Sequence, residues 1–526
     1  MKWQKFFPLI WILIFVMAGA LRLPSLSLRP MHTDEAVSAF RFSNLLERGE
    51  YQYDPQEYHG PSLYYLTLPG AWLGGYKNLS DLNESILRLV PVLFGLLTIF
   101  IFITFGQHVN HRAMMLAALF FAFSSLTVFY NRYYIHETLL STFVWSALLF
   151  GYLFIKKRKP VYVLLCGISL GLMISTKETW LIYAGAAVLA LLVLPEWRKV
   201  LILNIGRNLL LLFLPALVIV GLFYSSFFSN TRGITDFFLS FNHYFVRGAG
   251  ETIHSHPWYF YLKILLYSRT GATPVWTEGF IVILALLGIL FIFREKTSIR
   301  GDLSLAKFIA VFTILAVLIY SLIPYKTPWN ILGCLPGIVF LAGWAADHLL
   351  DRFPQKYMYY LISLIISLGL LHQIWQSRQL NFIHPCDPIN PYVYAHPGKD
   401  IFIIEEKMNE IMVSNTQANN IRVDVMVENH GYWPLPWYLR SWTRIGWWDQ
   451  VDPYNSPAPV ILISADLEDD FIKKIYEDTP AADRQLYVSL FNQKIELRPG
   501  FELLGFIRYD IWQTIDPQSS KPGNQP

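Results

Sequence analysis

Two adjacent carboxylates, Asp34 and Glu35, stand just beyond an apolar amino-terminal stretch, in the segment RPMHTDEAVSAF. Adjacent carboxylates repel each other, so the pair needs water, a cation or a proton close by. A carboxylate can take a proton from a hydroxyl or an amine, or it can help to hold a divalent cation. The role open to the pair therefore depends on the elements that surround it.

Other residues that could do chemistry occur in short segments between apolar runs: EYHGPSLYYL, NRYYIHETLL, STKETW, HSHPWYFYL and YKTPWN. Lysine and arginine can neutralise a phosphate, and histidine and carboxylate can move a proton or bind a metal. The candidates are the cations Arg88, Arg132, Lys177 and Lys326, the carboxylates Glu137 and Glu178, the histidines His59 and His254, and Tyr58.

The composition identifies the environment of these residues. Of the 526 residues, 54% are hydrophobic and 15% are charged, and the mean hydropathy is +0.36. Soluble domains carry about 25% charged residues, so the chain is built for a lipid bilayer. The uncharged run 6–21 follows Lys2 and Lys5 and could be a signal peptide with AGA as its cleavage site. Its length is at the upper limit for such a peptide, which favours a retained first transmembrane helix.

Ten further apolar runs approach the length that spans a bilayer. They are 89–105, 113–130, 139–155, 161–175, 180–194, 209–228, 279–293, 308–323, 331–346 and 357–374. Together with the first run, they predict an α-helical polytopic membrane protein with about eleven transmembrane helices.

The distribution of lysine and arginine predicts the orientation of these helices. With a cytoplasmic amino terminus, the inner loops hold KKRK, EWRK, FREKTSIR and DRFPQK, whereas each short outer loop holds one cation. Such an excess marks the cytoplasmic side. Asp34 then lies outside, in a long first outer loop (22–88), and a second long outer loop covers 229–278. The outer ends of the helices collect both signs of charge and several histidines, and ionisable groups at membrane depth are usually functional.

Residues 376–526 read as a soluble α/β domain on the outer side, after a membrane domain of residues 1–375. DIFIIEE, IRVDVMV and APVILISADL predict strands, DDFIKKIYED predicts a helix, and 515–526 predicts a disordered tail. Of the three cysteines, Cys386 alone falls outside the membrane and is expected to be exposed, so no internal disulfide is expected. The net charge of +4 reflects the basic inner loops and indicates no nucleic-acid partner.

These motifs resemble the C-type (GT-C) glycosyltransferases, particularly the protein O-mannosyltransferase and aminoarabinose-transferase branch. In that family an Asp-Glu pair follows the first helix, as Asp34-Glu35 does, and HGPSL (59–63) is similar to the motif that comes next. RLVPVLFG, YIHETLLSTF and IHSHPWYFYL are similar to further family motifs at Arg88, Glu137 and His254. EYHGPSLYYL with GYWPLPWYLR also resembles a subgroup of flippase-associated archaeal and bacterial membrane proteins.

The resemblance implies Asp34 as general base, with Glu35 beside it, and a metal at His59 and His254. Each residue also has a plainer interpretation. Asp34 could cap the helix predicted for EAVSAFRFSNLLERG. Glu35 could stand at the helix start because the helix dipole favours a negative charge there. The two histidines could form hydrogen bonds at the membrane interface. The single cations Arg88, Arg132, Lys177 and Lys326 could be snorkelling anchors, but their isolation favours contact with a donor phosphate. Glu137 and Glu178 could pair with those cations.

The sequence therefore predicts a membrane hexosyltransferase of the protein-glycosylation type. It would move a sugar from a polyprenyl-phosphate donor to a protein, lipid or glycan acceptor on the outer face. A divalent metal is a possible cofactor, and no nucleotide is expected because the sequence shows no soluble nucleotide-sugar domain. A transporter or accessory protein for lipid-linked sugars is the alternative, but it would need charges in mid-helix, and the eleven runs contain almost none.

Overall fold

The chain divides into two compact units. The computed structural model describes residues 6–56, 59–249, 254–295, 301–353, 355–415, 420–452, 454 and 456–515. Unit 1 comprises Met1–Leu26, Arg41–Lys77 and Leu82–Tyr394, and unit 2 comprises Ser27–Phe40, Asn78–Asp81 and Ala395–Pro526. The boundary after Tyr394 thus lies later in the chain than the predicted one, and unit 2 includes two segments of the predicted first outer loop. The predicted disordered tail falls, except for Ile515, outside the described residues.

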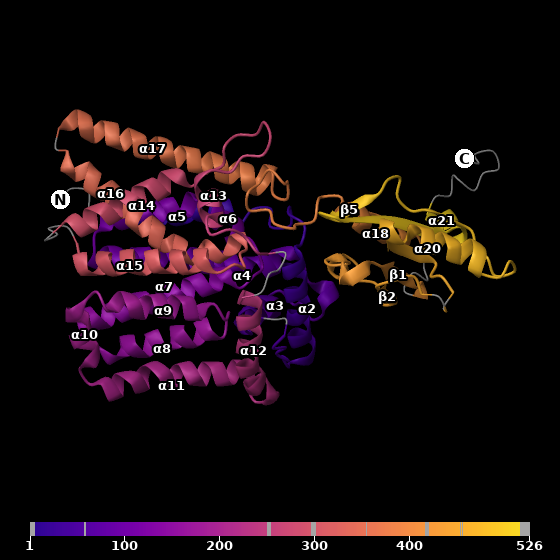
Figure 1. The fold of residues 1–526 in the computed structure, drawn as a ribbon, viewed down its shortest axis with the longest axis horizontal. Coiled ribbons are helices and arrows are strands. Elements are labelled where there is room, and N and C mark those ends of the chain that lie inside the picture. Colours follow the sequence, from indigo (N-terminus) through magenta and orange to yellow (C-terminus); the bar gives the residue numbers. More distant parts are fainter. Residues whose placement is uncertain are drawn as a thin grey trace. The chain divides into compact units, whose positions relative to one another are not determined.

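Unit 1 is almost entirely helical. Its helices are α1 (Phe7–Arg22), the second half of α2 (Thr33–Arg48), α3 (Ser62–Leu73), α4 (Glu84–His108), α5 (His111–Phe123), α6 (Ser125–Asn131), α7 (Glu137–Lys157), α8 (Pro160–Ile174), α9 (Trp180–Leu191), α10 (Pro195–Ile202), α11 (Ile205–Tyr224), α12 (Arg232–Ala249), α13 (Phe260–Leu266), α14 (Gly279–Arg294), α15 (Leu303–Leu322), η3 (Pro328–Cys334), α16 (Leu335–Arg352), α17 (Lys356–Arg378) and η4 (Gln379–Ile383). The long helices run side by side, and α12 runs across them (Figure 1).

Every predicted apolar run overlaps a helix of unit 1, but the number of spans is not confirmed. Among the described residues, six helices are long and apolar enough to cross a bilayer, or seven if the bent pair α5 and α6 is one span. Four of the predicted runs lie on the shorter helices α1, α8, α9 and α14, which have 10–17 residues. These fall below the roughly 20 residues that a span usually needs.

Side-chain caps define the beginnings of several of these helices. Asn83 accepts a hydrogen bond from Ile86 N at the start of α4, and Asp302 accepts from two backbone amides at the start of α15. Ser124 caps α6 at the point where α5 and α6 meet at 62°. Each cap satisfies an amide that the helix itself leaves without an acceptor.

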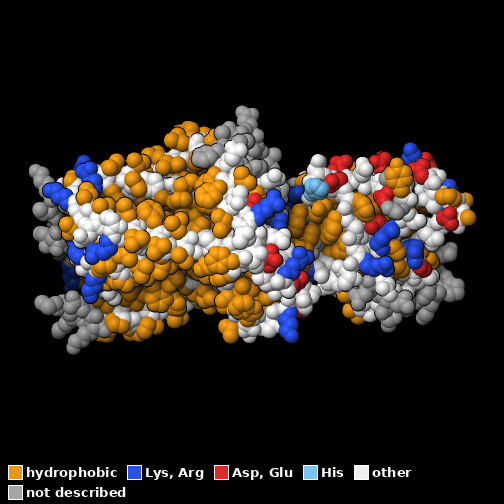
Figure 2. All heavy atoms as spheres, turned by 90° about the horizontal axis from the view of Figure 1, so that it is seen from below, with side chains coloured by type: hydrophobic (Ala, Val, Ile, Leu, Met, Phe, Trp, Pro, Cys, Tyr) orange, Lys and Arg blue, Asp and Glu red, His pale blue; other side chains and the backbone are white. Residues whose placement is uncertain are grey.

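The outer surface of unit 1 is apolar, as a surface in contact with lipid should be. Large apolar side chains are exposed along α11, among them Leu210, Phe213, Leu214, Leu217 and Val218. Figure 2 shows hydrophobic side chains over much of this unit, with Lys and Arg side chains toward its ends. An exposed surface of this kind fits a multi-pass membrane protein.

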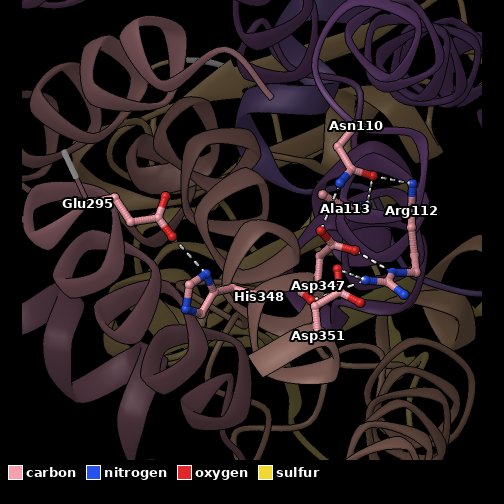
Figure 3. A network of polar contacts seen from close by, with 7 residues as sticks. All are labelled: Asn110, Arg112, Ala113, Glu295, Asp347, His348 and Asp351. Carbon is pink, nitrogen blue, oxygen red and sulfur yellow. Dashed lines mark hydrogen bonds and ion pairs between the residues drawn. The ribbon is translucent and has the colours of Figure 1, made fainter. Parts of the chain in front are cut away.

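A polar network ties the beginning of α5 to the end of α16 (Figure 3). Asn110 accepts from Arg112 N and Ala113 N at the start of α5 and donates through Nδ2 to Asp347, with 2.8 Å between the atoms. The Arg112 guanidinium pairs with Asp347 through Nε, and its Nη2 lies 2.7 Å from Asp351 Oδ2. His348 lies beside them, 2.9 Å from Glu295. These contacts fix α5, α16 and the end of α14 together.

We expect Asp347→Asn to destabilise unit 1 by about 1–3 kcal/mol, because it removes one partner from a charged hydrogen bond that is largely buried. Thermal unfolding of the detergent-solubilised protein measures the effect. Asp351→Asn is the matched control, because it contacts the same guanidinium but is 31% exposed, and exposed pairs contribute about 0–1 kcal/mol. Equal effects of the two variants would contradict the role of burial at Asp347.

Unit 2 contains a mixed sheet of six strands, β1 (Val423–Met426), β2 (Ile445–Trp448), β3 (Val460–Ser464), β4 (Tyr487–Ser489), β5 (Ile495–Arg498) and β6 (Phe501–Arg508). The strand order is β2-β1-β3-β6-β4, and β5 also pairs with β6. β1 is parallel to both β2 and β3, whereas β6 is antiparallel to β3. The predicted strands at IRVDVMV and APVILISADL are thus confirmed as β1 and β3.

The helices of unit 2 are α18 (Ile401–Ser414), α19 (Leu435–Tyr438), α20 (Glu468–Lys473) and α21 (Tyr509–Ile515), together with the short turns η2 (Leu79–Asp81), η6 (Glu428–His430), η7 (Ala465–Leu467) and η8 (Lys474–Asp478). The helix predicted for DDFIKKIYED is confirmed as α20 and η8. The strand predicted for DIFIIEE is wrong, because this segment begins α18. Its buried residues Ile401, Ile404, Met408 and Ile411 recur at helical spacing.

Cys386 also differs from the expectation, because it is buried within unit 1. All three cysteines are free, as expected.

Candidate active site

The segment after His59 lies directly against residues 175–178 in unit 1. Gly60 N donates to Thr176 O over 3.1 Å, and Ser62 N donates to Ser175 O over 2.9 Å. A Cβ added at Gly60 would lie 2.3 Å from Ser175 O, so only glycine allows this backbone approach. The contact explains why HGPSL places its histidine beside the STKETW segment.

Two acid–base pairs result from this contact. His59 Nδ1 lies 3.0 Å from Glu178 Oε2, with the His59 side chain 34% exposed and Glu178 7% exposed. The neighbouring Lys177 pairs with Glu137 through Nζ and Oε1, and both side chains are buried. The structure therefore brings together four of the predicted residues, which we call the His59 cluster: His59, Glu137, Lys177 and Glu178.

His136 belongs to the same cluster, although the sequence analysis did not single it out. Its ring centroid lies 5.3 Å from that of His59, and its Nε2 lies 3.0 Å from Gly60 O. Burial, with the charges of His59 and Lys177, holds the pKa of His136 well below its usual value. His136 is therefore neutral at physiological pH and fixes the position of Gly60 by a hydrogen bond.

The predicted residues Lys326 and His254 lie together in a second group. Lys326 N donates to His254 O over 2.9 Å, and Lys326 Nζ donates to His256 O over 2.8 Å. The hydroxyl of Tyr394 lies 2.7 Å from His254 Nδ1. Lys326 is 1% exposed, and burial lowers the pKa of its ammonium group. Both histidines of HSHPW, His254 and His256, thus contact the Tyr394 hydroxyl.

Arg88 and Arg132 contact the backbone that follows α1. Arg132 donates to the carbonyl oxygens of Leu21, Arg22, Pro24 and Ser25, and Arg88 Nη1 donates to Leu26 O over 2.6 Å. Carbonyls at the end of a helix need such donors. Both guanidinium groups thus have a structural role in stabilising this turn, and their contact with a phosphate stays a prediction.

Asp34 and Glu35 lie in the first turn of α2, in the part of the helix that belongs to unit 2. Glu35 is fully buried, accepts from His32 N over 3.2 Å and lies 3.8 Å from Arg29 Nη2. It therefore closes the helix start as the glutamate of a capping box does. The Asp34 side chain is 49% exposed, and its Oδ1 lies 3.9 Å from His32 Nδ1. Only Asp34 of the pair thus presents its carboxylate to solvent.

The predicted metal site at His59 and His254 stays a prediction. Among the residues described, no group of three or more His, Cys, Asp or Glu side chains is placed to hold a metal. His59 has Glu178 beside it and His254 has Tyr394, whereas a divalent metal usually takes three or more protein ligands. One such neighbour for each histidine falls short of that ligand set. Tyr58 lies outside the described residues.

The chain is similar to known proteins in part of its sequence and in its fold. The family model of the dolichyl-phosphate-mannose-protein mannosyltransferases matches residues 70–224. ArnT from Cupriavidus metallidurans, in a structure bound to undecaprenyl phosphate, superposes with a TM-score of 0.62 at 15% identity, over 94% of this chain and 98% of that chain. The chain has the C-type glycosyltransferase fold. The predicted resemblance to the GT-C superfamily is confirmed.

Archaeal proteins with this fold are also similar. AglB from Archaeoglobus fulgidus, in complex with an inhibitory peptide and a dolichol-phosphate, has a TM-score of 0.55 at 11% identity, covering 98% of this chain and 77% of that chain. An oligosaccharyltransferase from the same organism, in the apo form, has a TM-score of 0.53 at 12% identity, covering 85% and 65%. No curated protein sequence matches the chain.

The sequence analysis did not single out Glu278, a buried carboxylate of unit 1. Glu278 precedes α14 and accepts hydrogen bonds through Oε1 from Ser124 Oγ, Leu126 N and the Tyr392 hydroxyl. It is fully buried and stabilises the amino terminus of α6 at the 62° bend. Its place directly before the apolar run 279–293 was the signal that could have identified it.

Proposed function

We propose that the protein is an integral-membrane glycosyltransferase that moves a sugar from a polyprenyl-phosphate-linked donor to an acceptor outside the cell membrane. The observation that carries the proposal is the His59 cluster in unit 1 of a GT-C fold, where Lys177 and Glu137 form a buried ion pair next to His59 and Glu178. Buried ionisable groups in a membrane protein are costly and typically functional. Similar folds in structures bound to undecaprenyl phosphate and dolichol-phosphate support the class of donor.

In the proposed reaction, Lys177 and Lys326 hold the donor phosphate, which leaves as polyprenyl phosphate. Asp34 removes the proton from the acceptor hydroxyl or amine as this group attacks the anomeric carbon. The bond from that carbon to the phosphate oxygen breaks in the same step, so the configuration inverts. The half-exposed side chain of Asp34 supports its role as the base, because an acceptor from water can reach it.

The decisive test is transfer by purified protein in lipid nanodiscs, supplied with a polyprenyl-phosphate sugar and a set of peptide, lipid and glycan acceptors. We expect polyprenyl phosphate to be released together with a glycosylated acceptor. The control uses proteoliposomes that report movement of the same donor between leaflets. Leaflet exchange without release would show a transporter and would refute the proposal.

Lys326→Ala should weaken donor binding roughly tenfold to a hundredfold, because a charge-assisted contact to phosphate is worth about 1.5–3 kcal/mol. Binding of a non-transferable polyprenyl-phosphate analogue to the protein in nanodiscs measures this loss. Lys263→Ala is the control, because this lysine lies on α13 at the last turn and has no role in the proposal. An unchanged donor affinity would show that the Lys326 ammonium group only binds the carbonyl oxygens of His256 and Ile323.

A further inference from the structure

In unit 2, a series of aromatic rings leads from the helix that carries Asp34 to the edge of the sheet. Trp433 packs edge to face on Phe40 of α2, with ring centroids 5.5 Å apart. Tyr432 follows at 6.3 Å from Trp433 and lies 4.8 Å from Trp447 of the edge strand β2. We call Tyr432, Trp433 and Trp447 the aromatic surface. All three are partly exposed.

The aromatic surface lies where α/β sheets usually bind ligands. The chain passes from β1 to β2 on one side and then to β3 on the other side of β1. Such a reversal of strand order opens a crevice outside the carboxyl ends of the parallel strands. Tyr432 comes after β1 in the chain, and Trp447 is the last residue but one of β2. The position of the aromatic surface therefore fits a binding site.

A polar pair borders this surface. His430 follows β1 and Asp449 follows β2, and His430 Nδ1 lies 3.1 Å from Asp449 Oδ1. His430 N also donates to the same oxygen over 2.9 Å. The two side chains are 72% and 48% exposed. Asn429 and His430 both adopt left-handed backbone conformations, with φ of 54°; such conformations cost energy in residues with a Cβ and concentrate at functional sites.

We propose that the aromatic surface binds a neutral sugar ring of the acceptor, which makes the acceptor a glycan. Aromatic rings offer flat apolar faces that pack on the C–H face of a sugar, and the few polar groups at the border fix its orientation. A carboxylate and an imidazole can bond to its hydroxyls as acceptor and donor. This inference rests on the proposed function and names its acceptor class.

The test measures sugar binding without any donor, so it does not depend on turnover. Saturation-transfer NMR on the full-length protein in nanodiscs, with mannobiose, cellobiose and arabinobiose as probes, should show saturable binding of at least one disaccharide. Tyr432→Ala and Trp447→Ala should each weaken that binding about tenfold or more, as loss of a central aromatic contact does. Tyr432→Phe should retain it, because the ring remains.

The matched control is Tyr509→Ala, which removes a partly exposed tyrosine that stacks on Trp512 elsewhere in unit 2, with ring centroids 5.9 Å apart. It should leave binding unchanged. His430→Ala, at an exposed position, should weaken binding roughly twofold to tenfold through one lost hydrogen bond, even if Trp447→Ala fails to fold. Absence of binding by all three sugars, or binding that Tyr432→Ala leaves intact, would overturn the inference. Failure of sugar transfer with sugar binding retained would instead refute the proposed function.

Discussion

Asp34→Asn should lower the rate of sugar transfer about 10²–10⁴-fold, the contribution that a general base typically makes. Asparagine keeps the size of the side chain and its compatibility with a helix start, but it cannot take the acceptor's proton. The capping contacts of α2 come from Glu35 and the His32 backbone, so folding and membrane abundance should hold. The measurement is turnover at equal membrane abundance, with a saturating polyprenyl-phosphate sugar and acceptor.

Two further variants make this result specific. Asp469→Asn is the matched control, because Asp469 is also an exposed aspartate in the first turn of a helix, α20, and it should leave turnover unchanged. Glu35→Gln should lower stability more than turnover, because Glu35 is buried against Arg29. If Asp34→Asn and wild type transfer sugar at similar rates, Asp34 is not the base and the mechanism is wrong.

Lys177→Met should lower both stability and donor binding. It leaves the Glu137 carboxylate buried without its cation, and removal of one partner from a buried pair costs about 3–5 kcal/mol. It also removes the proposed contact with the donor phosphate, which should weaken donor binding roughly tenfold to a hundredfold. Thermal unfolding in detergent and binding of a polyprenyl-phosphate analogue separate the two effects.

The double variant Lys177→Met/Glu137→Gln distinguishes a structural from a functional lysine. Glutamine carries no charge, so the double variant should regain most of the stability while donor binding stays weak. Lys156→Met serves as the control, because Lys156 forms a Lys–carboxylate pair with Asp302 but is 47% exposed; it should change neither quantity much. Recovery of donor binding in the double variant would show that Lys177 serves only as the ionic partner of Glu137 and does not contact the donor.

The membrane helices could be predicted from the sequence because their signal is long and local. Each apolar run is set by composition over 15 residues or more, and every one overlaps a helix. The pairing of His59 with Glu178 could not be predicted in this way, since it depends on the close approach of Gly60 to Ser175, more than 100 residues along the chain. Sequence reasoning allowed for a pair between Glu137 and a cation such as Lys177, but it did not predict the pair of His59 with Glu178.

The errors have equally physical causes. DIFIIEE reads as a strand because its isoleucines and phenylalanine favour β structure, but the continuing spacing to Met408 and Ile411 makes it a helix. Arg88 and Arg132 stand alone in the sequence and suggested phosphate ligands; that role stays a prediction, but their structural contacts could not be predicted. The two arginines bind backbone carbonyl oxygens between Leu21 and Leu26. Because every residue has a backbone carbonyl, the sequence does not indicate which of them an arginine will bind.

The segment that carries Asp34 is part of unit 2, although it lies far along the chain from Ala395–Pro526, the largest segment of that unit. Met31 N donates to the Tyr438 hydroxyl over 2.8 Å, the His32 ring lies 4.7 Å from that of His396, and Phe40 packs on Trp433. Exchange of residues 395–526 between related proteins would therefore separate the segment from the surface on which it folds. A working chimera has to take residues 27–40 and 395–526 from the same parent.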